Sequence, residues 1–300
     1  MSRPWEGVVA LLKPPGVSSS DCVVDVRRLF GEKRVGHLGT LDPGAAGVLP
    51  VCVGRAVRLF DYLVDKDKTY RFQLILGAAT DTQDRFGRVI ETGKRDVTAQ
   101  EIEAVLPRFR GQIQQLAPAY SALKSNGQKL YDLALQGREV PEKRREVTIG
   151  DLRLLQQEGE GLFLLEMTCS RGTYVRTMCH DLGHALGTCG HMGALLRTRS
   201  GPFSVESAHS LAELRALQEA GRLGEALVSC EDALGQYPAL TLPEDRLIPT
   251  KNGLVTDLHG ADARPDGVFR LYCRGAFLGI GKVEDNRARL AVHLYDESIL

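Results

Sequence analysis

The sequence of 300 residues contains no long hydrophobic run. Its longest apolar stretches, such as residues 48–53 and 162–165, are far shorter than the roughly 20 residues that a membrane-spanning helix needs. The N-terminal segment MSRPWEG has no apolar region of the kind that secretory signals contain. We therefore expect a cytoplasmic protein that has no membrane partner.

The sequence also lacks any C-x-x-C pair. Its seven cysteines are an odd number and are scattered from Cys22 to Cys273. This distribution does not suit a disulfide framework, and it favours reduced thiols in a reducing compartment.

The chain has no excess of either charge, because Lys plus Arg and Asp plus Glu number 38 each. The charge of the whole molecule therefore gives no sign of a polyanionic partner, and any nucleic-acid binding must rest on local basic patches. Basic side chains cluster at residues 55–71, 124–129 and 143–145. Most such clusters are simply solvated surfaces.

No P-loop and no G-x-G-x-x-G follows a predicted strand, and helices and strands do not alternate as in βαβ units. Alternation of Tyr70, Phe72, Leu74 and Leu76 with polar residues predicts a half-buried strand. Ser18 to Ser20 can cap a helix, and Thr98 with Glu101 forms a capping box. The remaining expected strands are residues 8–12, 147–155, 162–169 and 194–199, followed by helices within 211–234.

The pattern changes near Tyr237, after which short strands are expected at residues 268–273, 276–283 and 288–294 between Gly, Pro and Asp turns. We predict an α+β protein with a mainly antiparallel central sheet and flanking helices. We place a first domain at residues 1–236 and a small all-β domain at residues 237–300.

The segment GHLGTLDPGAAGVLP, residues 36–50, holds four glycines and two prolines, and its ionisable side chains are His37 and Asp42. Pro43 favours an extended conformation at Asp42, so the acid is expected to be presented to solvent. L-D-P-G alone is equally typical of an ordinary surface turn. The segment therefore leaves a structural and a chemical interpretation open.

A second candidate is the predicted helix at residues 174–186, which Thr173 is placed to cap. Arg176 falls in its first turn, where a cation opposes the helix dipole, so an anionic partner is expected nearby. An arginine that lies over the helix surface is the alternative.

The same helix carries His180 and His184 at positions i and i+4, and the spacing is similar to the H-E-x-x-H of zincins. However, Val175, Met178 and Cys179 define the core stripe of this helix, so the histidines fall on the opposite face. We predict no metal, and a metal hydrolase remains the alternative.

The separate fragments together resemble the tRNA pseudouridine synthase B family, also called TruB. The resemblance is carried by GHLGTLDPGAAGVLP and by five further blocks in the same order: LLKPPGVSS at 11–19, DKTYRF at 67–72, AYSALKSNGQKLYDLA at 119–134, CSRGTYVRTMCHDLG at 169–183 and HMGALLRTRSGPF at 191–203. The ending, from PEDRLIPTKNGL to FLGIGKV, resembles the PUA-like RNA-binding domain of many members. The family pattern differs at Leu196, where arginine is common.

The resemblance implies the pseudouridine synthase fold with a C-terminal PUA-like β-barrel. It implies that the chain isomerises uridine 55 in the TΨC loop of tRNA by base flipping, with no cofactor. It makes Asp42 the catalytic aspartate, Tyr70 the ring that stacks on the uracil and Arg176 the partner of Asp42. The substrate-binding residues implied are His37, Tyr174, Leu195 and Lys13. The candidates for RNA-backbone contacts are Arg55, Arg58, Lys68, Lys124 and Arg197.

Further expectations concern partners. We expect a monomer that acts on tRNA without a guide RNA. Besides the metal hydrolase, a catalytically silent RNA-folding factor is an alternative function class, and an intact set of Asp42, Tyr70 and Arg176 argues against it. The sequence does not decide between a covalent adduct at C1′ and a glycal intermediate.

Overall fold

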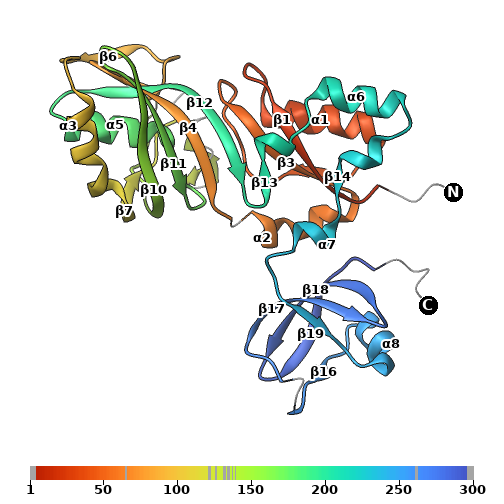
Figure 1. Cartoon of the computed structure of the whole chain (residues 1–300). Coiled ribbons are helices and arrows are strands. Elements are labelled where there is room, and N and C mark those ends of the chain that lie inside the picture. Colours follow the sequence, from red (N-terminus) through yellow and green to blue (C-terminus); the bar gives the residue numbers. More distant parts are fainter. Residues whose placement is uncertain are drawn as a thin grey trace.

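The structure is a computed structural model, and it describes residues 5–64, 66–120, 123–125, 127–130, 133, 136, 138, 140–260 and 263–295. A ten-stranded sheet dominates it (Figure 1). Its main path follows the order β14 (Leu227–Val228), β1 (Gly7–Lys13), β3 (Ala46–Val53), β12 (Gly190–Ser200), β4 (Lys68–Leu76), β11 (Leu162–Cys169), β10 (Arg144–Gly159) and β7 (Gly111–Leu116). Two short strands complete it, since β2 (Val35–His37) pairs with β3, and β13 (Phe203–Ser204) pairs with β12.

The pairings within this sheet are antiparallel except for the one between β3 and β12. There Ala46 pairs with Leu196 and Gly47 with Arg197 in parallel register. This short junction joins the two halves of the sheet. Because Asp42 lies four residues before β3 begins, the candidate aspartate is placed next to the junction.

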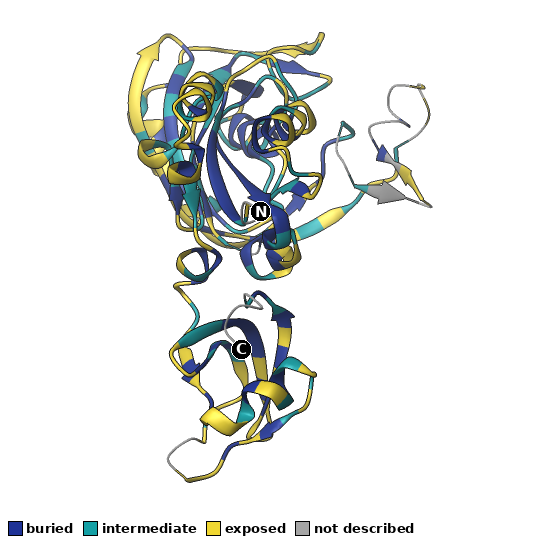
Figure 2. Ribbon diagram, turned by 90° about the vertical axis from the view of Figure 1, so that its right-hand side faces the viewer, coloured by how far each residue is buried: buried dark blue, intermediate teal, exposed yellow. Residues whose placement is uncertain are grey.

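Helices cover the sheet on both halves. One half is covered by α1 (Ser19–Phe30) and α6 (Leu211–Glu219), and the other by α3 (Ala99–Val105) and α5 (Val175–Ala185). Figure 2 shows mostly buried strands behind helices whose outer faces are exposed. The apolar side of α1, with Val23, Val26 and Leu29, packs in one core cluster with Leu49 and Val51 of β3.

Two small hairpins project from the sheet, and short helices connect its parts. The hairpins are β5 (Ala78–Thr80) with β6 (Val89–Thr92), and β8 (Lys124–Ser125) with β9 (Gln128–Lys129). These short helices are α2 (Phe60–Leu63) and α7 (Cys230–Ala233), and a third, α8 (Leu247–Lys251), lies in the C-terminal region. Among the described residues no helix is long and apolar enough to cross a membrane.

The C-terminal region forms a second, curled sheet in the order β15 (Ala239–Thr241), β17 (Gly267–Cys273), β18 (Ala276–Glu284), β19 (Arg287–His293) and β16 (Thr256–Asp257). It has a core of its own around Leu271 and Leu278. Ile280 and Leu294 instead join a cluster with Val8 and Leu59 of the large sheet's region, so the two sheets share an apolar junction.

Most expected elements are confirmed. Thr98 with Glu101 forms the capping box of α3, and Tyr70, Phe72, Leu74 and Leu76 share the buried face of β4. The α+β class with a mainly antiparallel central sheet is also confirmed. The strand expected at residues 147–155 is longer, because β10 pairs with β7 over Arg144–Ile149 and with β11 from Ile149 to Gly159.

Candidate active site

Asp42 stands at the first position of a β-turn. The turn is closed by a hydrogen bond from the Ala45 amide to the Asp42 carbonyl oxygen at 3.0 Å. The Asp42 side chain is 44% exposed, so the same turn that fits an ordinary surface loop also presents the carboxylate to solvent. The structural and the chemical interpretation of L-D-P-G are therefore compatible.

Buried polar groups hold this turn from beneath. The Ser19 hydroxyl accepts from the Leu41 amide and donates to the Leu41 carbonyl oxygen, both at 2.9 Å. The Lys13 ammonium donates to the carbonyl oxygens of Ala45 at 2.6 Å and Pro43 at 3.3 Å. Because buried hydrogen bonds to a charged donor are strong and directional, they fix the backbone on either side of Asp42.

Lys13 has no exposed surface, and burial lowers its pKa. The nearby Asp42 carboxylate acts in the opposite direction and raises the pKa of Lys13. The carboxylate thus stabilises the charged ammonium that holds its own loop. Lys13 supports the turn by its hydrogen bonds to the backbone. Its proposed role in substrate binding is therefore to hold the turn that carries Asp42.

Arg197 holds the other side of the loop. Its Nε donates to the Val48 carbonyl oxygen at 2.8 Å, and one Nη donates to the Gly39 carbonyl oxygen at 3.2 Å. The residue is only 1% exposed. The prediction that Arg197 contacts the RNA backbone is therefore wrong, because a guanidinium enclosed by its own loop cannot reach a phosphate.

Lys68 requires the same correction. It is buried, and its ammonium group donates to the carbonyl oxygens of Val64 at 3.0 Å and Lys66 at 2.6 Å. Its predicted contact with the RNA backbone is wrong for the same reason. Family blocks do not distinguish a cation that binds RNA from a cation that binds the protein's own backbone.

The Arg176 guanidinium reaches Asp42. Its Nε lies 3.2 Å from Asp42 Oδ2, and the Arg176 side chain is only 8% exposed. The other guanidinium nitrogens donate to the carbonyl oxygens of Tyr120 at 3.0 Å and Thr82 at 3.4 Å. Arg176 therefore has the anionic partner that its place in the first turn of α5 predicts. The two carbonyl contacts fix the orientation of the guanidinium, and this fixes the carboxylate as well.

The start of α5 is built differently from the sequence prediction. The N-cap residue is Tyr174, and its backbone amide donates to Gln115 Oε1 at 2.9 Å. The Thr173 hydroxyl donates instead to the Ser170 carbonyl oxygen, so the prediction that Thr173 caps the helix is wrong. Gln115, from the distant strand β7, is 1% exposed. Sequence reasoning missed it because its partner lies 59 residues away.

Tyr70 lies on β4 opposite Arg197 of β12 and Met167 of β11. It is only 8% exposed. Burial raises the pKa of Tyr70, and the neighbouring Arg197 acts in the opposite direction. The phenol is thus protonated at neutral pH, where it can donate a hydrogen bond. Leu195, half-buried, pairs with Phe72 beside an irregularity of β12 and packs against the same core.

His37 is the last residue of β2 and precedes Asp42 by five residues. Burial lowers the pKa of His37, and the nearby Arg197 charge lowers it further, so the imidazole is neutral at pH 7. Among the described residues its buried Nδ1 has no hydrogen-bond partner. A buried nitrogen without a hydrogen-bond partner lowers the stability of the folded protein. Such an atom is suited to gain its hydrogen bond from a ligand.

The histidine pair on α5 has a simple geometry. The Nε2 atoms of His180 and His184 are 3.1 Å apart, and His184 is exposed. Asp181 adds one contact to His180 at 3.3 Å. Within the described residues no group of three or more His, Cys, Asp or Glu side chains could hold a metal ion. The zincin-like spacing therefore has no third ligand here.

The other three residues predicted to contact the RNA backbone differ in their surroundings. Arg55 pairs with Glu6 and donates to the carbonyl oxygens of Leu294 and Tyr295, so it joins the two sheets. Arg58 is exposed and makes a longer contact to the His293 carbonyl oxygen at 3.4 Å. The backbone of Lys124 belongs to β8, and its side chain lies outside the described part of the structure.

Comparisons with known proteins give a consistent result. A model of the TruB family pseudouridylate synthase N-terminal domain matches residues 27–175. A model of the tRNA pseudouridylate synthase B C-terminal domain matches residues 176–235. The chain is 43% identical over 280 residues to tRNA pseudouridine synthase B of Heliobacterium modesticaldum, covering 92% of this chain and 90% of that one. It is 43% identical over 285 residues to the protein of that name from Chromohalobacter salexigens, covering 94% and 92%.

Solved structures agree with the fold. A chain from the crystal structure of a Cbf5-Nop10-Gar1 complex superposes with a TM-score of 0.72 at 26% identity, covering 97% of this chain and 84% of that one. A chain from an H/ACA RNP bound to a substrate RNA containing 2′-deoxyuridine has a TM-score of 0.70 at 24% identity, with coverages of 96% and 84%, and supports the fold alone. From the two family models, the curated relatives and this shared fold, we conclude that the chain belongs to the TruB family of pseudouridylate synthases.

Proposed function

We propose that this protein converts uridine 55 in the TΨC loop of tRNA to pseudouridine. The observation that carries the proposal is the Asp42 carboxylate, partly exposed, 3.2 Å from the buried Arg176 guanidinium. Relatives named tRNA pseudouridine synthase B, which match over nine-tenths of the chain, support tRNA as the substrate.

The reaction needs a carboxylate beside the ribose. The N1–C1′ bond breaks, the uracil turns, and C5 bonds to C1′. The proton on C5 then leaves and N1 takes up a proton, so the product is an isomer of the substrate. Asp42 either attacks C1′ or removes the 2′ hydrogen, and both routes remain open. Neither route changes the redox state, so we propose that no cofactor or metal takes part. Arg176 holds the carboxylate in one orientation throughout.

The target uridine must leave the RNA stack before Asp42 can reach its sugar, at a cost of a few kcal/mol. We assign stacking on the uracil to Tyr70 and contacts around the pocket to Leu195 and Tyr174. His37, with its neutral imidazole and its Nδ1 without a partner, is assigned to recognition of the opened loop. The protonated Tyr70 is a poor base below its raised pKa, so we assign it no part in the early steps.

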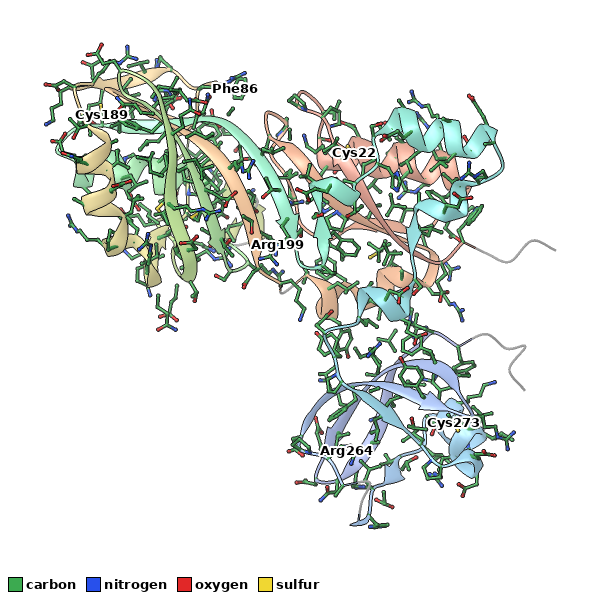
Figure 3. All side chains as sticks on the ribbon, in the orientation of Figure 1. Cys22, Phe86, Cys189, Arg199, Arg264 and Cys273 are labelled. Atoms are coloured by element: carbon green, nitrogen blue, oxygen red, sulfur yellow. The ribbon has the colours of Figure 1, made fainter. Side chains whose placement is uncertain are left out.

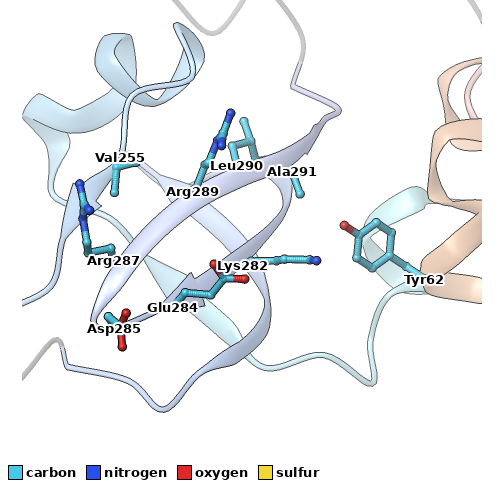
Figure 4. A pocket seen from close by; sticks show the side chains of 9 residues that line it. All are labelled: Tyr62, Val255, Lys282, Glu284, Asp285, Arg287, Arg289, Leu290 and Ala291. Atoms are coloured by element: carbon cyan, nitrogen blue, oxygen red, sulfur yellow. The ribbon is translucent and has the colours of Figure 1, made fainter.

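We assign RNA binding to the curled sheet as well, within a PUA-like domain at residues 237–300 that follows a catalytic domain at residues 1–236. A groove on β18 and β19 is lined by three cations, Lys282, Arg287 and Arg289, by two acids, Glu284 and Asp285, and by Tyr62 of α2 (Figure 4). The cations outnumber the acids, so the groove has a net positive charge. Lys282 and Arg289 are direct cross-strand neighbours. Like charges in that position repel each other, and an RNA phosphate would relieve the repulsion.

We further propose that the protein acts as a monomer, without a guide RNA, in the cytoplasm. The seven cysteines are unpaired and buried, as suits a reducing compartment. The competing function is an RNA-folding factor that opens the tRNA elbow without modifying it.

The test uses unmodified tRNA and an unmodified T-arm stem-loop. After incubation with the protein, digestion maps any pseudouridine to its position, and tritium release from C5-labelled uridine measures turnover. Pseudouridine at position 55 in both RNAs, with matching tritium release, is the expected result. RNA binding without tritium release would favour the folding factor, and pseudouridine at another position would overturn the assignment to the TΨC loop.

A further inference from the structure

Phe86 is an aromatic side chain at the surface beside the proposed active site. It lies in the loop of the β5–β6 hairpin and is 65% exposed. Figure 3 labels it at the end of this hairpin that faces β12 and the other half of the large sheet. None of the proposed steps uses it.

The ring lies directly against the Asp42 turn. A Cβ built on Gly44 would be 2.3 Å from Phe86 Cε2 and 2.8 Å from Cζ, so the ring edge occupies the space that a side chain at position 44 would need. Gly44 is two residues from Asp42. Phe86 therefore extends the surface that surrounds the carboxylate.

The loop that carries Phe86 is rigidly built. The Phe86 amide donates to Asp84 Oδ1 at 3.0 Å, and the Thr82 hydroxyl donates to the same oxygen at 2.7 Å. The Arg85 amide donates to the Met192 carbonyl oxygen at 2.9 Å. The Thr82 carbonyl oxygen also accepts from Arg176, the partner of Asp42. The loop that positions Phe86 therefore contacts the Arg176 guanidinium as well. Such a loop holds an exposed aromatic ring in a defined place.

A cation accompanies the ring. The guanidinium carbon of Arg85 lies 5.1 Å from the centroid of the Phe86 ring. An exposed ring with an adjacent arginine is suited to single-stranded RNA, since the ring stacks on a base and the guanidinium meets a phosphate. A protein partner has no comparable support, because the contacts of this loop lead to the proposed uridine site.

We propose that Phe86 is a stacking platform for a T-loop base that flanks the flipped uridine, and that Arg85 binds the adjoining phosphate. This inference rests on the proposed function and extends it by one nucleotide. It makes Phe86 and Arg85 substrate-binding residues and assigns them no part in the chemical step.

The first test compares variants on a T-arm stem-loop. Base stacking contributes about 1–3 kcal/mol per base, so Phe86→Ala should lower kcat/KM and the affinity by about 5- to 150-fold. Phe86→Leu keeps an apolar contact with Gly44 but has no aromatic face, and it should show a similar loss. Phe86→Trp should retain wild-type values. Ile90→Ala is the matched control, since Ile90 is 61% exposed on the same hairpin, and it should change neither value.

The second test locates the stacked base. Stem-loops with an abasic nucleotide at each position flanking uridine 55 are measured against wild type and Phe86→Ala. At one position the abasic RNA should bind wild type about as weakly as the intact RNA binds Phe86→Ala. Combining that abasic RNA with Phe86→Ala should then lower the affinity no further. Wild-type affinity for Phe86→Leu, or additive losses at every position, would overturn the inference.

The binding measurements separate this inference from the proposed function. Equilibrium affinities are measured in the Asp42→Asn background as well, where no turnover is expected. If wild type bound the stem-loop but formed no pseudouridine, the proposed function would fail while the abasic comparison still tested Phe86. If wild type were active and Phe86→Ala matched it in both assays, only the stacking platform would fail.

Discussion

Gly47 lies directly against the backbone of Arg197: a Cβ built on Gly47 would be 2.2 Å from the Arg197 carbonyl oxygen and 2.6 Å from its amide nitrogen. The two residues are partners in the parallel junction between β3 and β12. This close approach brings Arg197 under the loop that it holds. The position of Asp42 thus depends on a glycine five residues away.

Gly47→Ala should disturb the site without changing any polar group. Gly47 has φ +116°, which other residues rarely adopt, and the new methyl group would meet backbone atoms. We expect a loss of at least about 2 kcal/mol in the free energy of unfolding, with a parallel loss of activity. Gly36→Ala is the control, since a Cβ there meets nothing within 4 Å. Equal denaturation midpoints for the two variants would contradict the argument.

Asp42→Asn tests the chemical role of the carboxylate. The amide keeps the size of the side chain and the turn, but it can neither attack C1′ nor accept a hydrogen. Turnover should fall below detection, while affinity for tRNA should stay within a few fold. Single-turnover tritium release and filter binding measure the two. If affinity and turnover fell equally, Asp42 would be a structural residue of the turn.

Arg176→Lys tests the orientation of Asp42. Lysine keeps the charge but cannot contact Asp42, Tyr120 and Thr82 in the same geometry. Charged hydrogen bonds contribute about 1.5–3 kcal/mol each, so kcat should fall roughly 10- to 100-fold. KM should change less. Wild-type kcat in this variant would mean that Asp42 needs only a nearby positive charge.

The pH dependence of stability should contain a contribution from His37. Its pKa is lowered in the folded protein from the ordinary value of 6.5. As the pH falls through 6.5, the unfolded chain takes up a proton at His37 before the folded one does, so the folded state loses stability towards acid. His37→Gln should remove this part of the loss. Urea midpoints from roughly pH 7.5 to pH 5 measure it; identical pH profiles for variant and wild type would contradict it.

Lys282→Gln with Arg289→Gln tests the groove on the curled sheet. Each phosphate contact that is lost should lower the slope of log affinity against log salt by roughly 0.7–0.9. The double variant should therefore bind tRNA more weakly and with a shallower salt dependence, at unchanged kcat. Arg222→Gln is the control, since Arg222 is already paired with Glu225 at 2.7 Å. An unchanged slope would place RNA binding elsewhere on the protein.

Local patterns predicted the elements well. The period-two alternation from Thr69 to Leu76 and the capping box of Thr98 depend on neighbours in the chain, and both appear as expected. The Asp42 and Arg176 pair was also predicted, because a helix-opening cation needs an anion and the family blocks suggest which one. Their proposed catalytic roles remain for the variants above to test.

Only the tertiary structure decided which cations face inward. Arg197 and Lys68 look like exposed RNA contacts in the sequence, yet both bind backbone carbonyl oxygens inside the protein. Gln115 at the start of α5 and Phe86 against Gly44 are likewise long-range contacts. The sequence by itself determined the expected helices and strands and the presented aspartate, because these follow from short-range periodicity and turn chemistry. It did not predict the strands β3 and β7 of the main sheet. The partners of the buried polar groups depend on which distant strands become neighbours, and that is set only when the sheet assembles.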